Sequence, residues 1–98
     1  MLLKINTNDY DNFSLWLLDK DNKALDSMRI STRDKKLSRL LLPSIDKFFK
    51  KNNEAMNDIS KILIVTSISK FNMNFKIGMA GALALGYGLK IPISKVKT

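Results

Sequence analysis

The sequence of 98 residues is 45% hydrophobic and 27% charged, a balance typical of one globular domain rather than a disordered chain. It contains no cysteine and no histidine, which excludes disulfides, thiolate chemistry, zinc sites built from these residues and imidazole acid–base catalysis. The net charge of +8 would favour an anionic partner, either a nucleic acid or an acidic protein surface, but lysine far outnumbers arginine, so a biased composition is the favoured explanation of this charge.

Two segments bear on location. The N-terminus, MLLKINTNDYDN, turns polar after five residues, so we do not expect a signal peptide. The apolar run from Ile77 to Leu89 has thirteen residues, short of the roughly 20 that a membrane-spanning helix needs. We therefore expect a cytoplasmic protein with no membrane contact.

The first third of the sequence predicts an antiparallel meander. Three apolar or alternating runs, Leu2 to Ile5, Phe13 to Leu18 and Ala24 to Ser31, are separated by turns rich in Asn and Asp. The lone Trp16 lies in the second strand, where packing in the core or on the sheet face is favoured over a role as a base-stacking platform.

A first helix is predicted from Lys35 to Lys51, with the turn-like Thr32-Arg33-Asp34 as its N-terminal cap and Asn52 and Asn53 at its end. Its apolar positions span an arc of about 200°, roughly twice the stripe that one packing surface requires. Pro43 lies inside this pattern and predicts either a kink or a late helix start. The sheet can cover about half of this arc, so the remaining apolar surface of the helix indicates a binding partner.

The second half of the sequence continues with a strand, a loop, a helix and a strand. Lys61 to Thr66 is a continuous apolar run typical of a strand covered on both faces and parallel to a neighbour. A polar loop from Ser67 to Asn74 leads to a helix from Phe75 to Lys90, and Ile91 to Val96 begins the last strand.

The second helix carries two rows of small residues at a spacing of four. Gly78, Ala82 and Gly86 form one row, and Ala80, Ala84 and Gly88 form the other. Small side chains at this spacing allow another backbone to approach closely. We expect one row to pack in the protein's own core and the other to meet a partner helix.

The order β-β-β-α-β-α-β predicts an α/β fold with a mixed sheet and two main helices. This order resembles the layout of the ribonuclease-H-like half-domain in the actin-like ATPase superfamily.

Three segments resemble the N-terminal half of the TsaB (YeaZ-type) family, whose members take part in making threonylcarbamoyladenosine in tRNA. Leu2 to Asn8, LLKINTN, is similar to the opening strand, and Ser38 to Ile45, SRLLLPSI, is similar to the first helix. Lys76 to Ile93, KIGMAGALALGYGLKIPI, resembles the Ala- and Gly-rich helix and its Gly-Ile-Pro exit. The resemblance implies one domain, residues 1–98, equivalent to an N-terminal lobe without the second lobe. Either a natural short form or half of a longer protein would fit.

The sequence also departs from the family pattern. Asn6 stands where the wider superfamily has an acidic residue, and the family's glycine-rich loop is replaced by the glycine-free segment Ser67 to Asn74. Such a loop cannot form a phosphate-binding nest of backbone amides, although Lys70 or Lys76 could contact an anion by charge alone. We therefore expect no catalytic, cofactor-binding or metal-binding residues and no cofactor.

The resemblance implies a non-catalytic scaffold that pairs through its two helices with the catalytic subunit TsaD. A TsaE-like ATPase would be a further partner, and tRNA would be reached only through the complex. The predicted partner interface comprises Leu37, Leu41, Ile45, Phe48, Gly78, Met79, Ala82, Leu83 and Gly86. On this assignment Ala82→Glu should abolish partner binding and leave a folded protein.

Two other functions stay open. The same helices could form a homodimer, or the basic last forty residues could form a small RNA-binding module. Enzyme activity is disfavoured, because the closely spaced acidic pairs, Asp9 with Asp11 and Asp19 with Asp21, are interpreted as turn formers.

Overall fold

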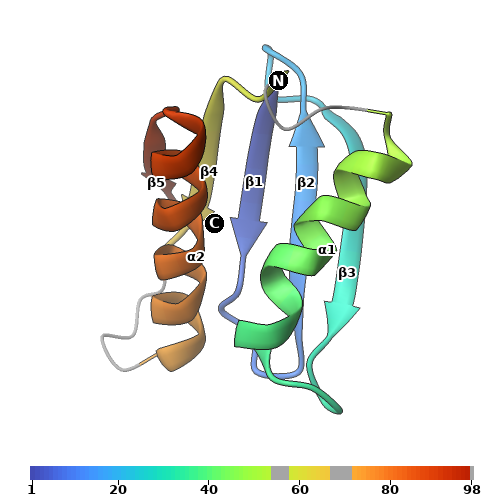
Figure 1. Ribbon diagram of the computed structural model, residues 1–98, viewed down its shortest axis with the longest axis vertical. Coiled ribbons are helices and arrows are strands. Elements are labelled where there is room, and N and C mark those ends of the chain that lie inside the picture. Colours follow the sequence, from blue (N-terminus) through green and yellow to red (C-terminus); the bar gives the residue numbers. More distant parts are fainter. Residues whose placement is uncertain (54–57, 67–71, 98) are drawn as a thin grey trace.

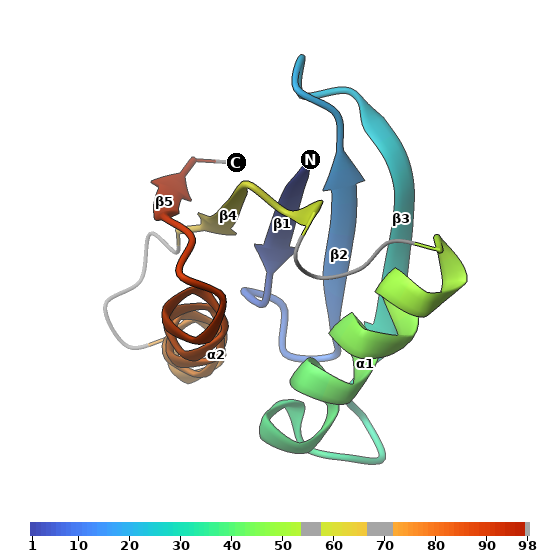
Figure 2. The same ribbon diagram turned by 45° about the horizontal axis from the view of Figure 1, so that its top comes forward.

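The computed structural model describes residues 1–53, 58–66 and 72–97 and contains a five-stranded sheet with two helices on one face (Figure 1). The view turned by 45° also places both helices on the same side of the sheet (Figure 2). The elements in chain order are β1 (Leu2–Asn6), β2 (Asn12–Leu18), β3 (Ala24–Ser31), α1 (Leu37–Lys51), β4 (Lys61–Val65), α2 (Met73–Leu89) and β5 (Ile93–Val96).

The sheet is mixed, as predicted. Its strand order is β3-β2-β1-β4-β5, with β1, β2 and β3 antiparallel and with β4 parallel to both β1 and β5. Helix α2 packs over β1, β4 and β5, and α1 packs over β2. The predicted α/β fold with the order β-β-β-α-β-α-β is therefore confirmed.

Alternation along the strands builds the core between the sheet and the helices. Leu3 and Ile5 on β1 are fully buried, and so are their register partners Ile62 and Ile64 on β4. Residues between them, such as Lys4, point to the opposite face, because successive strand side chains alternate. One face of the sheet thus supports the helices, and the other face is more polar.

The prediction that β4 is covered on both faces is not met within the described residues. Both helices lie on one face (Figures 1 and 2), and Leu63, on the other face, is only half-buried. Coverage of that face is partial, because Val65, which alternates with Ile64 at the end of β4, is 1% exposed.

Helix α1 begins two residues later than predicted and lacks the predicted cap. Its N-cap residue is Lys36, which makes no side-chain capping bond, whereas the Thr32 hydroxyl donates to the Tyr10 carbonyl (2.7 Å) and so fixes the preceding turn. The helix continues through Pro43. It ends at Asn52, whose side-chain amide donates to the Phe48 carbonyl (2.8 Å), as expected for a C-terminal stop.

The acidic pairs form turns, as the sequence predicts. The Asp9 carboxylate accepts the Asp11 backbone N–H (2.9 Å), and the Asp19 carboxylate accepts the Asp21 backbone N–H (2.8 Å). Both are side-chain-to-backbone turns in which the carboxylates serve the local backbone conformation.

Candidate functional site: the outer surface of the helix layer

One small-residue row of α2 packs against the chain's own strands. A Cβ placed on Gly78 would lie 2.8 Å from Thr7 Cγ2 and closer still to Thr7 Oγ1, and one on Gly86 would lie 2.7 Å from Ile93 Cδ1. Ala82, between them, is 0% exposed. Gly78, Ala82 and Gly86 therefore let α2 lie close to the end of β1 and to β5, which is a contact within the core.

The other row of α2 faces away from the sheet. Ala80, Ala84 and Gly88 are exposed, and a Cβ on Gly88 would meet no atom within 4 Å. Leu83 and Tyr87 lie beside this row and are 53% and 89% exposed. This side of α2 is thus apolar, built of small residues, and open.

Helix α1 adds to the same layer. Leu41 of α1 contacts α2 at Gly81, where a Cβ would lie 2.6 Å from Leu41 Cδ2, so the two helices touch each other. Leu42, the next residue of α1, is 47% exposed. We define the outer surface as the exposed apolar and small residues of both helices: Leu42, Ala80, Leu83, Ala84, Tyr87 and Gly88.

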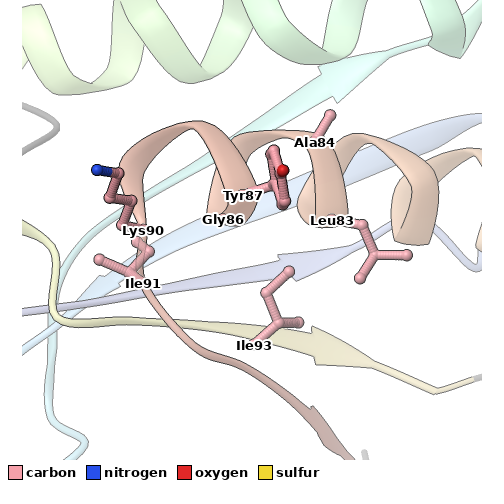
Figure 3. Close-up of a pocket in the computed structure, with 7 residues that line it drawn as sticks. All are labelled: Leu83, Ala84, Gly86, Tyr87, Lys90, Ile91 and Ile93. Carbon is pink, nitrogen blue, oxygen red and sulfur yellow. The ribbon is translucent and has the colours of Figure 1, made fainter.

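A groove of about 980 Å³ continues the outer surface between α2 and β5 (Figure 3). Leu83, Tyr87 and Ile93 line it with apolar groups, and Lys90 stands at its end. Lys90 is the C-cap of α2 in a left-handed conformation (φ 58°). The groove therefore combines apolar walls with one cationic end.

Most of the predicted interface residues are buried in the core and are not part of the outer surface. Leu37, Leu41, Ile45, Phe48, Gly78, Ala82 and Gly86 are buried inside the chain, Met79 is half-buried, and Leu83 is exposed. The buried residues already pack in the core, so a partner that docks on this side would contact the outer surface instead. That the two helices bind a partner stays a prediction.

The carboxyl end of β1 is held by a network of amide side chains that the sequence did not predict. The Asn6 side-chain oxygen accepts the Asn8 N–H (3.0 Å), and the Asn8 amide donates to the carbonyls of Val65 (3.4 Å) and Thr66 (3.1 Å). Asn72 caps α2 by accepting the Phe75 N–H (3.0 Å) and donates to the Asn8 carbonyl (3.0 Å). Asn6 thus makes a structural hydrogen bond at the carboxyl end of β1.

Residues 67–71 of the predicted glycine-free loop, Lys70 among them, lie outside the described residues. Within the described ranges, no three Asp or Glu side chains come close enough together to hold a metal ion. No helix in that part of the chain is long and apolar enough to cross a membrane.

Hydrogen bonds lower the pKa of Asp26. Asp26 on β3 accepts the Ser27 backbone N–H (2.8 Å), which lowers the pKa of its carboxyl group, helped by a bond from Asn52 and by Lys51 at 3.3 Å. These contacts connect the C-terminal end of α1 to β3 and lie away from the outer surface.

These features define the class of protein by fold: an α/β half-domain with a five-stranded mixed sheet and two helices on one face. No protein-family model and no curated protein matches the sequence. Among solved structures, YeaZ from Pseudomonas aeruginosa superimposes with a TM-score of 0.79 at 20% identity over 98% of this chain and 43% of that one.

A second Pseudomonas aeruginosa structure, of an uncharacterized protein with similarity to peptidase YeaZ, gives a TM-score of 0.80 at 22% identity over 98% of this chain and 42% of that one. RuvC from Thermus thermophilus is more distant, with a TM-score of 0.63 at 7% identity over 98% of this chain and 63% of that one. The chain has the YeaZ-type fold that the sequence predicts, and it spans less than half the length of these two Pseudomonas proteins.

Proposed function

We propose that this chain is a non-catalytic docking subunit that binds a TsaD-type catalytic protein through the outer surface. Its role would lie in the cytoplasm, in the formation of threonylcarbamoyladenosine in tRNA, with a TsaE-like ATPase as a further partner. The observation that carries the proposal is the exposed row Ala80, Ala84 and Gly88, flanked by Leu83 and Tyr87.

The composition of α2 supports a protein partner. The helix has no acidic residue, and it exposes an aromatic ring, a leucine and three small residues along one side. A helix that faces only water would carry mainly charged residues there. Small side chains also permit a partner helix to approach closely, which increases the van der Waals contact between the two backbones.

A non-catalytic role is supported by the end of β1. Asn6 cannot be ionised and its amide oxygen already accepts a backbone hydrogen bond. Thr7 is fully buried, with its hydroxyl donating to the Asn74 carbonyl (2.8 Å). These groups stabilise the junction between β1 and α2 and leave no carboxylate on β1 for positioning a metal ion.

Ala84→Arg tests the proposal. The arginine adds bulk and charge to an exposed position, so the fold should persist while binding to the TsaD-type protein of the same organism falls by at least about tenfold. Co-purification and calorimetric titration with that protein would measure the loss. Ala24→Arg, an equal change at an exposed position on β3, is the matched control. Full binding by Ala84→Arg would contradict the proposal.

A homodimer through the same surface is the competing function. Lys76 and Lys90 flank the exposed row near the two ends of α2. An antiparallel pairing of two α2 helices would bring these like charges together, which disfavours self-association. Light scattering with and without the TsaD-type protein separates the two cases, because a tight homodimer that this protein does not open would favour self-association.

Gly88→Ala should affect stability and binding in opposite directions. A Cβ at this position meets no atom of the chain, and alanine favours the helix over glycine by up to about 1 kcal/mol. The free energy of unfolding in urea should therefore rise. If a partner backbone packs against Gly88, affinity for the TsaD-type protein should fall at the same time, whereas unchanged affinity would exclude Gly88 from the interface.

A further inference from the structure

The face of the sheet opposite the helices has its own chemistry. A register row crosses all five strands through Ser27, Trp16, Lys4, Leu63 and Ser94, and the next row contains Arg29, Ser14 and Asn6. None of these residues is acidic. This face therefore presents cations, amides, hydroxyls, a leucine and one large aromatic ring.

Three shallow depressions on this side adjoin one another through shared lining residues, and we call them together the groove. Trp16 lines both the first depression, with Lys4 and Lys97, and the second, with Asn6 and Ser14. Asn12 and Arg29 line both the second depression and the third. The groove thus runs from the exposed end of β5, past Trp16, to the turn between β1 and β2.

The aromatic ring has a cation beside it. Lys4 Nζ lies 5.2 Å from the centre of the Trp16 ring, on its face. An ammonium group at this distance is attracted to the ring by a cation–π interaction. A flat π system could displace the ammonium group from the face of the ring. The lysine could then pair with a nearby anion.

The charges along the groove favour a polyanion. Lys4, Lys97, Arg29 and Arg33 line it against Asp9 and Asp11. Arg33 has a long contact of 3.9 Å with Asp11, but Arg29 makes no ion pair within the described residues. An apolar helix laid on this face would bury Lys4 and Arg29 without anionic partners, at a high desolvation cost.

We propose that this groove binds single-stranded nucleic acid, with one base stacked on Trp16 and phosphates held by Lys4 and Arg29. Stacking on an aromatic ring together with a cationic path for the backbone is how proteins hold single strands without reading sequence. Asn6, Asn12 and Ser14 can both donate and accept hydrogen bonds, which suits base edges and ribose hydroxyls. The site is separate from the outer surface of the helices, so both could be occupied together.

Trp16 reports directly on this proposal, because it is the only tryptophan in the chain. Titration of the 98-residue protein with an oligouridine RNA of about 12 nucleotides should quench its fluorescence as a base stacks on the ring. Each phosphate contact on a single strand contributes about 0.7 to the slope of log affinity against log salt. Two or three contacts predict a roughly tenfold loss of affinity between about 50 and about 200 mM salt.

Arg29→Ala and Arg39→Ala form a matched pair. Each removes one positive charge from an exposed arginine, but Arg39 lies on α1, on the other side of the sheet. Arg29→Ala should weaken binding about fivefold and reduce the salt slope by about 0.7, whereas Arg39→Ala should change neither by more than about twofold. Equal weakening by both variants would indicate diffuse charge attraction and overturn the proposal.

Three further titrations, with DNA, with a duplex and with the TsaD-type protein, decide what the groove binds. Oligouridine RNA and the DNA of matching sequence distinguish a ribose-dependent site from one that accepts either strand, and quenching by either supports the proposal. Binding of a duplex as tight as that of the single strand overturns it, and so does the absence of quenching at low salt. If the TsaD-type protein quenches Trp16 and no oligonucleotide does, the face is a protein-docking surface and the proposal fails.

Discussion

Replacing Ala82 with glutamate is expected to unfold the protein. Ala82 lies on the side of α2 that faces the sheet and is 0% exposed. The new carboxylate would therefore be buried without a partner. The unpaired charge and the added volume together should cost about 4–8 kcal/mol. A domain of this size has a total free energy of unfolding of roughly 5–15 kcal/mol, and towards the lower end of that range the substitution removes all of it. Thermal melting followed by far-ultraviolet circular dichroism should show no cooperative transition.

Ala84→Glu is the matched control for this prediction. The same change at a position two residues away on the same helix introduces the carboxylate on the exposed side. Its melting temperature should stay within a few degrees of the original, since substitutions at exposed positions usually change stability by less than about 0.5 kcal/mol. A cooperative, nearly unchanged transition for Ala82→Glu would contradict the packing described for α2.

The pair also shows how far the sequence predicts α2: it indicates the fold, but it does not show which row of the helix is buried. The order of strands and helices follows from turn-forming Asn and Asp residues and from hydrophobic periodicity, which are local signals. Two rows of small residues on α2 were visible as well, and the expectation that one packs in the core is confirmed by Gly78 and Ala82. Periodicity alone did not show which row that would be.

The sequence could not predict which side of α2 faces the sheet, because both sides of the helix are apolar. A helix with one polar face reveals which side is buried, and α1 has such a face, with Arg39 and Lys47 exposed. On α2 the exposed side carries Leu83 and Tyr87 instead, and its one charged residue, Lys76, lies in the first turn and marks only that end of the row. Assignment of Ala82 and Gly86 to the interface followed from this ambiguity.

The amide network at the end of β1 was missed for another reason. Asn8 and Asn72 are far apart in the sequence, and nothing local distinguishes an amide that bonds across the fold from one that forms a turn. The signal that could have found them is Asn72 in N-cap position before a helix, together with the Asn-rich end of β1. Parallel pairing of β1 with β4 is what brings the groups together.

Gly78→Ala provides a second test of the junction between β1 and α2, with a large expected effect. The added Cβ would lie 2.8 Å from Thr7 Cγ2 and closer still to Thr7 Oγ1. Thr7 cannot turn away easily, because its side chain is fully buried and its hydroxyl donates to the Asn74 carbonyl (2.8 Å). Overpacking of this kind costs about 1–3 kcal/mol, and the better helix propensity of alanine returns at most about 1 kcal/mol. Urea denaturation should therefore show a net loss of stability.

A double-mutant cycle with Thr7→Ala distinguishes this close contact from a general effect on the helix. Thr7→Ala alone should cost about 1–2 kcal/mol, because the Asn74 carbonyl loses its hydroxyl donor and a small space opens. In the double variant the methyl group introduced by Gly78→Ala occupies that space, so the combined loss should be smaller than the sum of the two by about 1–2 kcal/mol. Additive losses would mean that Gly78 does not approach Thr7. The close approach of α2 to β1, which turns the other row of the helix toward solvent, would then have to be abandoned.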